Sequence, residues 1–203
     1  MSTRVRRFLA HPACTALFWV LALWPGLDLL GAAVLNTLGA NPAEALIRRT
    51  GDWSLRFLCL TLAVTPLRQW MGWPELARRR RFLGLTTFSY ACLHLLCYAW
   101  LDMGLDGLEL LKDIGKRNFI LVGFLAWLML SLLAATSMQR AMRWLGGARW
   151  KRLHRAVHGV AVLAILHFFW MRAGKQNFGE VALYAAILGG LLGWRVWRAL
   201  RSR

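Results

Sequence analysis

Acidic residues are scarce in this chain of 203 residues, which has 9 Asp and Glu against 26 Lys and Arg. None of the acids lies deep within a long apolar run, which argues against a proton or cation pathway through a membrane. Nucleotide-binding signatures are missing as well, because the chain has neither a GxGxxG fingerprint nor a P-loop. We therefore expect no nicotinamide-binding domain on this chain.

Cysteine patterns that would hold a metal or a disulfide framework are absent too. The four cysteines, Cys14, Cys59, Cys92 and Cys97, all lie within apolar segments, and no two of them form a CxxC pair. We therefore expect neither a zinc site nor a disulfide scaffold. Small packing residues are the expected role of these thiols.

Long apolar runs dominate the chain, in which 58% of residues are hydrophobic and 12 are Trp. The six apolar stretches are Cys14–Leu38, Trp53–Leu67, Phe82–Leu101, Phe119–Ala135, Val157–Trp170 and Phe178–Trp197. Most of them approach the ~17–25 residues that cross a hydrocarbon core as a helix, and the two shorter ones are expected to borrow flanking residues. We predict an all-α integral membrane protein, a six-transmembrane-helix bundle that forms a single domain over residues 1–203.

The first stretch is predicted to be a retained span rather than a cleaved signal peptide, because it is long and lacks a clear small-x-small cleavage site. Its outer end contains Trp24, Pro25, Gly26 and Asp28. Because proline breaks the hydrogen-bond ladder of a helix, we expect this end to be kinked or unwound.

Basic charge is distributed unevenly between the two sides of the predicted bundle. If the N-terminus is cytoplasmic and all six stretches span, 18 of the 26 Lys and Arg but only one acid, Glu75, lie inside. The inner net charge is then +17 and the outer net charge is 0. This positive-inside pattern predicts that both termini of a multi-pass membrane protein lie in the cytoplasm. It also explains the charge of +17 without a nucleic-acid partner.

The basic runs Arg78–Arg81 and Arg149–Arg155 are interpreted mainly as topogenic charge. The alternative is that they bind anionic membrane lipid headgroups or a phosphate-bearing cofactor.

Two histidines lie deep within apolar segments, where an imidazole must be paired or ligated. His94 lies 13 residues beyond Arg81, and His167 lies 12 residues beyond Arg155. At 1.5 Å per residue these spacings correspond to depths of ~20 Å and ~18 Å. Two imidazoles at matching depth on separate helices can ligate one haem iron from both faces, which suits electron transfer. The alternative is a pair of interhelical hydrogen bonds.

His154 lies at the inner boundary and suggests a second, inner site. The segment that holds His94 offers Arg80 and Arg81 at the positions where a partner histidine would be needed. On an ideal helix His154 and His167 would point ~140° apart, so a bulge or helix rotation is needed if both face the same neighbours. We therefore predict one tight haem and a weaker inner cofactor or quinone site near His154, Arg80 and Arg149. The role of His158, one turn after His154, stays open.

Of the basic residues at the outer ends of the segments, Arg56 lies furthest into its segment. Its position allows two interpretations. It can bind a haem propionate through both guanidinium nitrogens. It can instead extend to the membrane surface.

Four stretches together resemble the ferric-reductase-like transmembrane family, in which His pairs on the third and fifth helices hold stacked haems. These stretches cover most of residues 50–171 and are Thr50-Gly51 with LRFLCLTLAVTPL, RRFLGLTTFSYACLHLLCY, RNFILVGFLAWLMLSLLAATSMQRAMRWLG and RWKRLHRAVHGVAVLAILHFFW. More narrowly, the chain is similar to the haem-binding membrane subunits of bacterial methionine-sulfoxide reductase systems. The resemblance implies b-type haem, with His94, His154 and His167 at the positions of the haem histidines. FMN is also associated with these subunits, but no residue pattern places it here, so the inner position is left open for a second haem, a flavin or neither.

The function implied by the resemblance is an electron conduit in the bacterial inner (cytoplasmic) membrane. Electrons would enter from the quinone pool or a cytoplasmic flavin donor, cross the membrane by haem, and leave to a periplasmic molybdenum-containing (molybdopterin) methionine-sulfoxide reductase that repairs oxidised proteins. The reduction of methionine sulfoxide would occur on that partner. The alternatives are a membrane ferric or metal-ion reductase with its own substrate site, and a cofactor-free transporter or assembly subunit.

The charge asymmetry predicts the outcome of cysteine labelling in intact cells. A membrane-impermeant thiol reagent should reach a cysteine introduced at Asp106 but not one introduced at Arg79, because only the first lies on the predicted periplasmic side. The reverse labelling pattern would contradict both the topology and the direction of electron flow.

Overall fold

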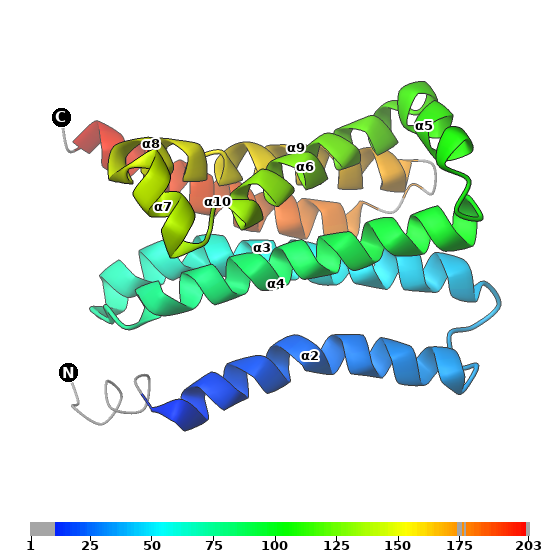
Figure 1. Ribbon diagram of the computed structural model, residues 1–203, viewed down its shortest axis with the longest axis horizontal. Coiled ribbons are helices and arrows are strands. Elements are labelled where there is room, and N and C mark those ends of the chain that lie inside the picture. The colour runs from blue at the N-terminus through cyan, green and yellow to red at the C-terminus, as the bar shows by residue number, and fades with distance from the viewer. Residues whose placement is uncertain (1–10, 174–175, 177, 202–203) are drawn as a thin grey trace. The chain divides into compact units, whose positions relative to one another are not determined.

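The computed structural model describes residues 11–173, 176 and 178–201, and all regular elements within them are helices (Figure 1). They are α2 (Pro12–Val34), α3 (Pro42–Met71), α4 (Leu76–Cys97), the π-helix η1 (Tyr98–Asp102), α5 (Gly107–Lys116), α6 (Asn118–Ala135), α7 (Gln139–Leu145), α8 (Gly147–His154), α9 (Val157–Ala173) and α10 (Gly179–Arg201). The chain divides into two compact units, Met1–Gly104 and Leu105–Arg203. The interpretation of residues 1–203 as one domain stays a prediction. Of the residues counted above as inner charges, Arg4, Arg6, Arg7 and Arg203 lie outside the described part.

Five helical segments among the described residues are long and apolar enough to cross a membrane. They are Pro12–Val34, Leu76–Asp102, Asn118–Ala135, Gly147–Ala173 and Gly179–Arg201. The protein is thus an all-helical membrane protein with five candidate spans. Helix α3, which contains the predicted second span, is not among them, although its 30 residues would rise about 45 Å. Its membrane crossing and the side on which the termini lie stay predictions.

Helix α2 continues through Pro25 to Val34, so its outer end is not unwound. It curves along its length instead (Figure 1). A side chain from α4 supports the helix at this point, because the Tyr90 hydroxyl donates to the Ala22 carbonyl oxygen at 2.8 Å. A Cβ at Gly26 would lie only 3.3 Å from that hydroxyl. The glycine next to Pro25 therefore makes room for the hydrogen bond that links α2 to α4.

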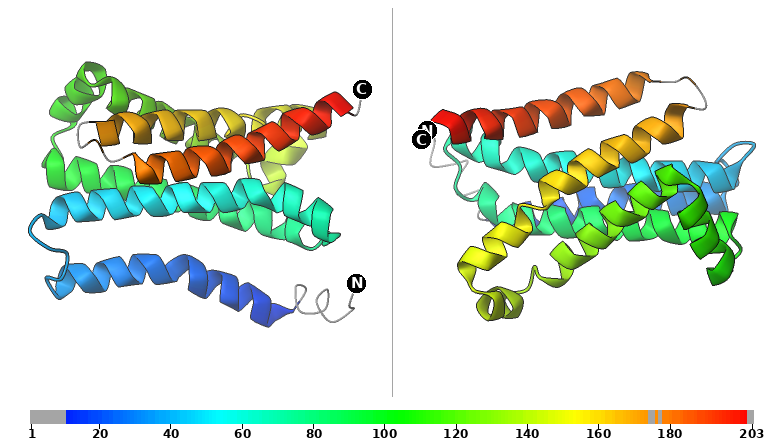
Figure 2. Two further views of the ribbon diagram at one scale, coloured as in Figure 1. Left: turned by 180° about the vertical axis from the view of Figure 1, so that it is seen from behind. Right: turned by 90° about the horizontal axis from the view of Figure 1, so that it is seen from above.

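Helices α3 and α4 form the antiparallel pair at the centre of the first unit, side by side in Figures 1 and 2. Gly72 ends α3 with φ 64°, a left-handed conformation that glycine adopts without strain. The interface buries two threonine hydroxyls, Thr61 and Thr87, whose oxygens lie 3.4 Å apart. The Ser54 hydroxyl donates to the Thr87 carbonyl oxygen at 3.1 Å. Small residues and interhelical hydrogen bonds of this kind hold helices together in lipid, where burial of apolar surface gives no driving force.

The second unit is built on α6 and α9, which lie side by side, with α10 packed along α9 (Figure 2). Helices α5, α7 and α8 lie between the apolar stretches that are predicted as spans. Asp106 begins α5, since its carboxylate accepts from the backbone N–H groups of Leu108 and Glu109. A turn at residues 155–156 separates α8 from α9.

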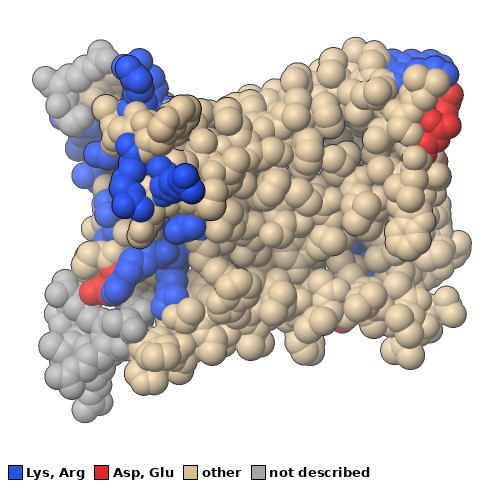
Figure 3. Space-filling view, viewed as in Figure 1, with Lys and Arg blue, Asp and Glu red and all other residues tan. Residues whose placement is uncertain are grey.

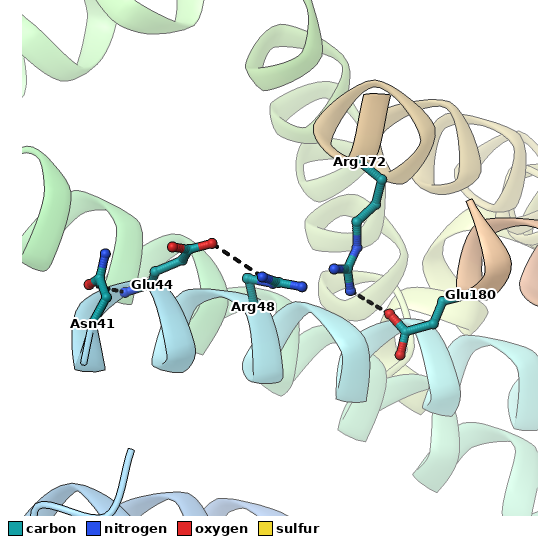
Figure 4. A network of polar contacts seen from close by, with 5 residues as sticks. All are labelled: Asn41, Glu44, Arg48, Arg172 and Glu180. Atoms are coloured by element: carbon teal, nitrogen blue, oxygen red, sulfur yellow. Dashed lines mark hydrogen bonds and ion pairs between the residues drawn. The ribbon is translucent and has the colours of Figure 1, made fainter. Parts of the chain in front are cut away.

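Each unit has an ion pair at the end of a helix (Figure 4). At the start of α3, the Asn41 side chain accepts from the Glu44 N–H at 3.1 Å, and Glu44 pairs with Arg48 at 3.2 Å. In the second unit Arg172, at the end of α9, is only 3% exposed and forms an ion pair with Glu180 at the start of α10. This pair compensates the cost of burying a guanidinium.

Charge and apolar surface are separated within each unit. Lys and Arg gather around the α3–α4 turn of the first unit and over α7 and α8 of the second, whereas the helix sides are apolar (Figure 3). Large side chains such as Trp24, Leu30 and Val196 are more than half exposed. A soluble protein rarely exposes so much continuous apolar surface, so these helix sides are suited to lipid.

The bond from Tyr90 to α2 predicts a graded loss of stability in detergent. Tyr90→Phe removes one interhelical hydrogen bond and should cost about 0.6 kcal/mol. Tyr90→Ala also empties a buried aromatic site and should cost about 3–5 kcal/mol. The midpoint of thermal unfolding measures both changes, with Trp24→Ala, at a side chain 65% exposed, as the control. Equal midpoints for Tyr90→Ala and the control would contradict the assigned packing.

Candidate functional site

His94 is half-buried on α4 and is oriented by the backbone of α3. Its Nδ1 lies 2.8 Å from the Ile47 carbonyl oxygen. Because a carbonyl oxygen can only accept, Nδ1 carries the proton and Nε2 of the neutral ring carries the lone pair. The Thr50 hydroxyl also lies 2.9 Å from this carbonyl oxygen, but it is closer to that of Leu46, at 2.7 Å. Proteins that bind a metal through Nε2 commonly fix the imidazole with a hydrogen bond of this kind from Nδ1.

His167 has the same arrangement in the second unit. Its Nδ1 lies 2.7 Å from the carbonyl oxygen of Phe119, at the start of α6. The Phe119 ring lies beside the imidazole, with ring centroids 6.2 Å apart. The two carbonyls precede their histidines by 47 and 48 residues. Each helix pair therefore holds one imidazole in the same tautomer.

A glycine lies against each imidazole. It comes four residues after the residue whose carbonyl is hydrogen-bonded to that imidazole. A Cβ at Gly51 would lie 3.1 Å from Nδ1 and Cε1 of His94. A Cβ at Gly123 would lie 2.7 Å from Nδ1 and 2.8 Å from Cε1 of His167. Gly123 thus allows an approach that a Cβ would block, and Gly51 allows one at which a Cβ would be unusually close.

His154 is held differently from the other two candidate ligands. Its Nε2 lies 3.2 Å from the Thr136 hydroxyl, which itself donates to the Leu132 carbonyl oxygen at 2.7 Å. Because the threonine proton is used there, Nε2 of His154 is the donor and its Nδ1 carries the lone pair. The Trp150 ring stacks on the imidazole with centroids 4.0 Å apart, and its Nε1 donates to the Thr136 carbonyl oxygen at 2.8 Å.

The helix is broken between His154 and His167, an interruption that both histidines need if they are to face the same neighbours. His154 ends α8, and the turn at residues 155–156 precedes α9. As a result both histidines contact α6, His154 through Thr136 at its C-terminal end and His167 through Phe119 at its N-terminal end. An uninterrupted helix would have turned one of them away.

The predicted arginines occupy both units. Arg56 is half-buried on α3, with its guanidinium carbon 4.5 Å from the centroid of the Trp53 ring, a cation–π contact. Arg80 is exposed on α4, and Arg149 is exposed on α8 in the same helix as His154. Within the described residues, no group of three or more His, Cys, Asp or Glu is placed to hold a metal ion.

Sequence reasoning missed the residues that orient the imidazoles. The carbonyls of Ile47 and Phe119 leave no mark in a sequence, because any residue supplies one. Gly51 and Gly123 do leave a mark, since a glycine inside an apolar helix often indicates close approach of another group. Nothing in the sequence pattern pointed to Thr136 as a contact of His154.

Comparison with known proteins gives a consistent family. The family model described as "Ferric reductase like transmembrane component" matches residues 50–166 and so ends one residue before His167. A "Protein-methionine-sulfoxide reductase heme-binding subunit MsrQ" of Polaromonas naphthalenivorans (strain CJ2) is 55% identical over 95% of this chain and 88% of its own length. Proteins with the same description from Ralstonia nicotianae (strain ATCC BAA-1114 / GMI1000) and Azospira oryzae (strain ATCC BAA-33 / DSM 13638 / PS) are 51% and 48% identical. They cover 91% and 93% of this chain, and 85% and 81% of their own lengths.

No solved structure matches the chain. The family model nevertheless covers more than half of it, and the relatives align along nearly all of it. The chain therefore belongs to the ferric reductase like transmembrane family and, within that family, to the MsrQ proteins.

Proposed function

We propose that this protein is the haem-binding membrane subunit of a methionine-sulfoxide reductase system, and that it conducts electrons across the inner membrane. The relatives' description as a heme-binding subunit supports this function. The observation that carries the proposal is the shared orientation of His94 and His167, each with Nδ1 on a backbone carbonyl and the lone pair on Nε2.

His94 and His167 are the proposed axial ligands of one haem b. Their depths of ~20 Å and ~18 Å from the basic inner ends of their helices match. A neutral imidazole with the lone pair on Nε2 is the form that binds iron. If both imidazoles held the iron, the bound haem would supply reversible one-electron transfer rather than oxygen chemistry.

Electrons enter on the cytoplasmic side in this proposal, from quinone or a flavin donor, and leave to a periplasmic molybdenum-containing reductase subunit. The charge asymmetry of the sequence supports this orientation. Six spans complete the bundle if α3 crosses with the five candidate segments. The length of α3, about 45 Å, exceeds the hydrocarbon thickness of about 30 Å.

The inner site is proposed near His154, Arg80 and Arg149, for quinone, FMN or a second, weaker haem. The contact of His154 Nε2 with Thr136 distinguishes this histidine from the two outer ligands. An exposed guanidinium such as that of Arg149 suits a phosphate or a propionate. Arg56 is the proposed partner of a propionate of the outer haem, and its stacking on Trp53 limits the directions it can take.

A membrane metal-ion reductase is the second candidate, favoured by the match to the ferric reductase like family. It differs in one measurable respect. A metal-ion reductase, once reduced, would transfer electrons rapidly to ferric chelates without a partner protein, whereas the proposed conduit needs its periplasmic subunit for rapid turnover.

Replacing either outer histidine should abolish the bis-imidazole haem. His94→Ala and His167→Ala each remove one axial ligand, so the low-spin absorption and electron paramagnetic resonance (EPR) signals of that haem should disappear. His11→Ala is the control, because His11 is exposed and caps the start of α2. Full haem content and unchanged spectra in both single variants would contradict the assignment, and a colourless wild-type protein would contradict the function.

Replacing the inner histidine should separate electron entry from haem binding. His154→Ala should leave the outer haem bound but slow its reduction from the cytoplasmic side, as measured by stopped-flow spectroscopy in oriented vesicles with a quinol donor. A reduction rate equal to that of the wild type, or a second bis-His haem of equal affinity, would refute the inner-site proposal.

A further inference from the structure

The two imidazoles are held by the same backbone arrangement, which is a helix carbonyl with a glycine four residues after it. In an α-helix the carbonyl oxygen of residue i accepts the N–H of residue i+4. Gly51 is four residues after Ile47, and Gly123 is four residues after Phe119. The same carbonyl oxygen therefore has two donors. One is Nδ1 of the histidine, and the other is the backbone N–H of the neighbouring glycine, four residues later in the helix.

The glycine at this position determines whether the carbonyl is accessible. Side chains at i and i+4 share one face of a helix, and the Cα–Cβ bond tilts toward the N-terminus, over the preceding turn. A side chain at residue 51 or 123 would thus cover the carbonyl one turn earlier. The Cβ distances of 3.1 Å at Gly51 and 2.7 Å at Gly123 show that the imidazole occupies this space.

We propose that Gly51 and Gly123 are positioning residues for the haem, each opening a backbone carbonyl that fixes the tautomer and direction of its axial histidine. This inference rests on the proposed function, because it assigns the glycines a role in setting the properties of the ligated iron. A hydrogen bond from Nδ1 makes the imidazole a stronger electron donor at Nε2. A stronger donor stabilises ferric over ferrous iron and so keeps the midpoint potential low.

The two glycines are not equivalent. Real Cβ atoms essentially never approach another heavy atom closer than 3.0 Å, and a Cβ at Gly123 would do so twice. At Gly51 the contact of 3.1 Å is tight, but a shift of a few tenths of an ångström relieves it. In neither case can the imidazole move away easily. A hydrogen bond to the carbonyl holds Nδ1, and the iron would hold Nε2. Alanine should therefore disturb His167 more than His94.

Alanine substitution tests the proposal, with two matched glycine controls. The control Gly84→Ala introduces a methyl group at 3.8 Å from its nearest neighbour, Thr61. The control Gly159→Ala, on the helix of His167, meets only the flexible end of Met129, at 3.3 Å. All four sites are helical, and glycine-to-alanine changes favour helix by up to ~1 kcal/mol, so the backbone tolerates them.

The measurements on each purified variant are haem content, midpoint potential and the EPR g-values of the oxidised haem. Gly123→Ala should bind haem about 10- to 100-fold more weakly, as expected for loss of a partner that orients a ligand. Gly51→Ala should retain haem but show a higher midpoint potential and altered g-values. Both controls should match the wild type in all three quantities.

The outcomes separate this inference from the proposed function. If the wild type holds a bis-His haem and both Gly123→Ala and Gly51→Ala leave its content, potential and g-values unchanged, the glycine role is wrong and the function stands. If Gly123→Ala does not accumulate, Gly51→Ala decides alone, with a raised potential in support and an unchanged potential against. A wild type without haem refutes the proposed function and the inference together.

Discussion

The hydrogen bond between a histidine Nδ1 and a backbone carbonyl on the neighbouring helix is the interaction on which the proposed site depends. It occurs twice, at 2.8 Å for His94 and at 2.7 Å for His167. In an apolar environment an imidazole must pair its polar atoms, and this bond satisfies one nitrogen while fixing the role of the other. The same bond joins α3 to α4 and α6 to α9, so the orientation of each ring and the packing of its helix pair are determined together.

Hydrogen bonds from side chains to the backbone carbonyls of neighbouring helices recur in both units. Tyr90 bonds a carbonyl of α2, Ser54 bonds a carbonyl of α4, and Trp150 bonds the carbonyl of Thr136 at the end of α6. Lipid offers no water to replace such bonds and no hydrophobic driving force between helices. Small residues at these interfaces therefore have two effects. They let the helix backbones approach closely, and they leave backbone carbonyls accessible to side chains of the neighbouring helix.

Apolar length and charge predicted most of the helices. The stretch Phe119–Ala135 was expected as a span and matches α6, Asn118–Ala135, almost residue for residue. Helix α3 extends well beyond its predicted stretch at both ends, since Asn41 and Pro42 begin it and Gly72 ends it, which are local signals that an apolar count ignores. Helices α5, α7 and α8 were missed because they are short and polar, and tertiary context rather than apolar length determines them.

The candidate ligands were found from the sequence because a histidine in an apolar helix is conspicuous. Their orientation was not found, since it depends on carbonyls and on the absence of a side chain, and a pattern of residue types does not show either. The distinct contact of His154 with Thr136 depends on the turn at residues 155–156. Helix geometry indicates that an interruption is needed if both histidines face the same neighbours, but nothing in RLHRAVHG shows where it occurs.

We propose that the backbone of this membrane protein orients two imidazoles for one haem iron and that methionine sulfoxide is reduced on a partner protein. This proposal depends on which atoms bind the iron. A cryo-electron-microscopy structure of the haem-loaded protein at side-chain resolution tests it most directly. We expect Nε2 of His94 and Nε2 of His167 to lie on opposite faces of the same haem, each ring with its Nδ1 still hydrogen-bonded to its carbonyl. A tight haem whose iron is bound by His154 in place of His94 or His167, or by only one of the two outer histidines, would contradict the proposal.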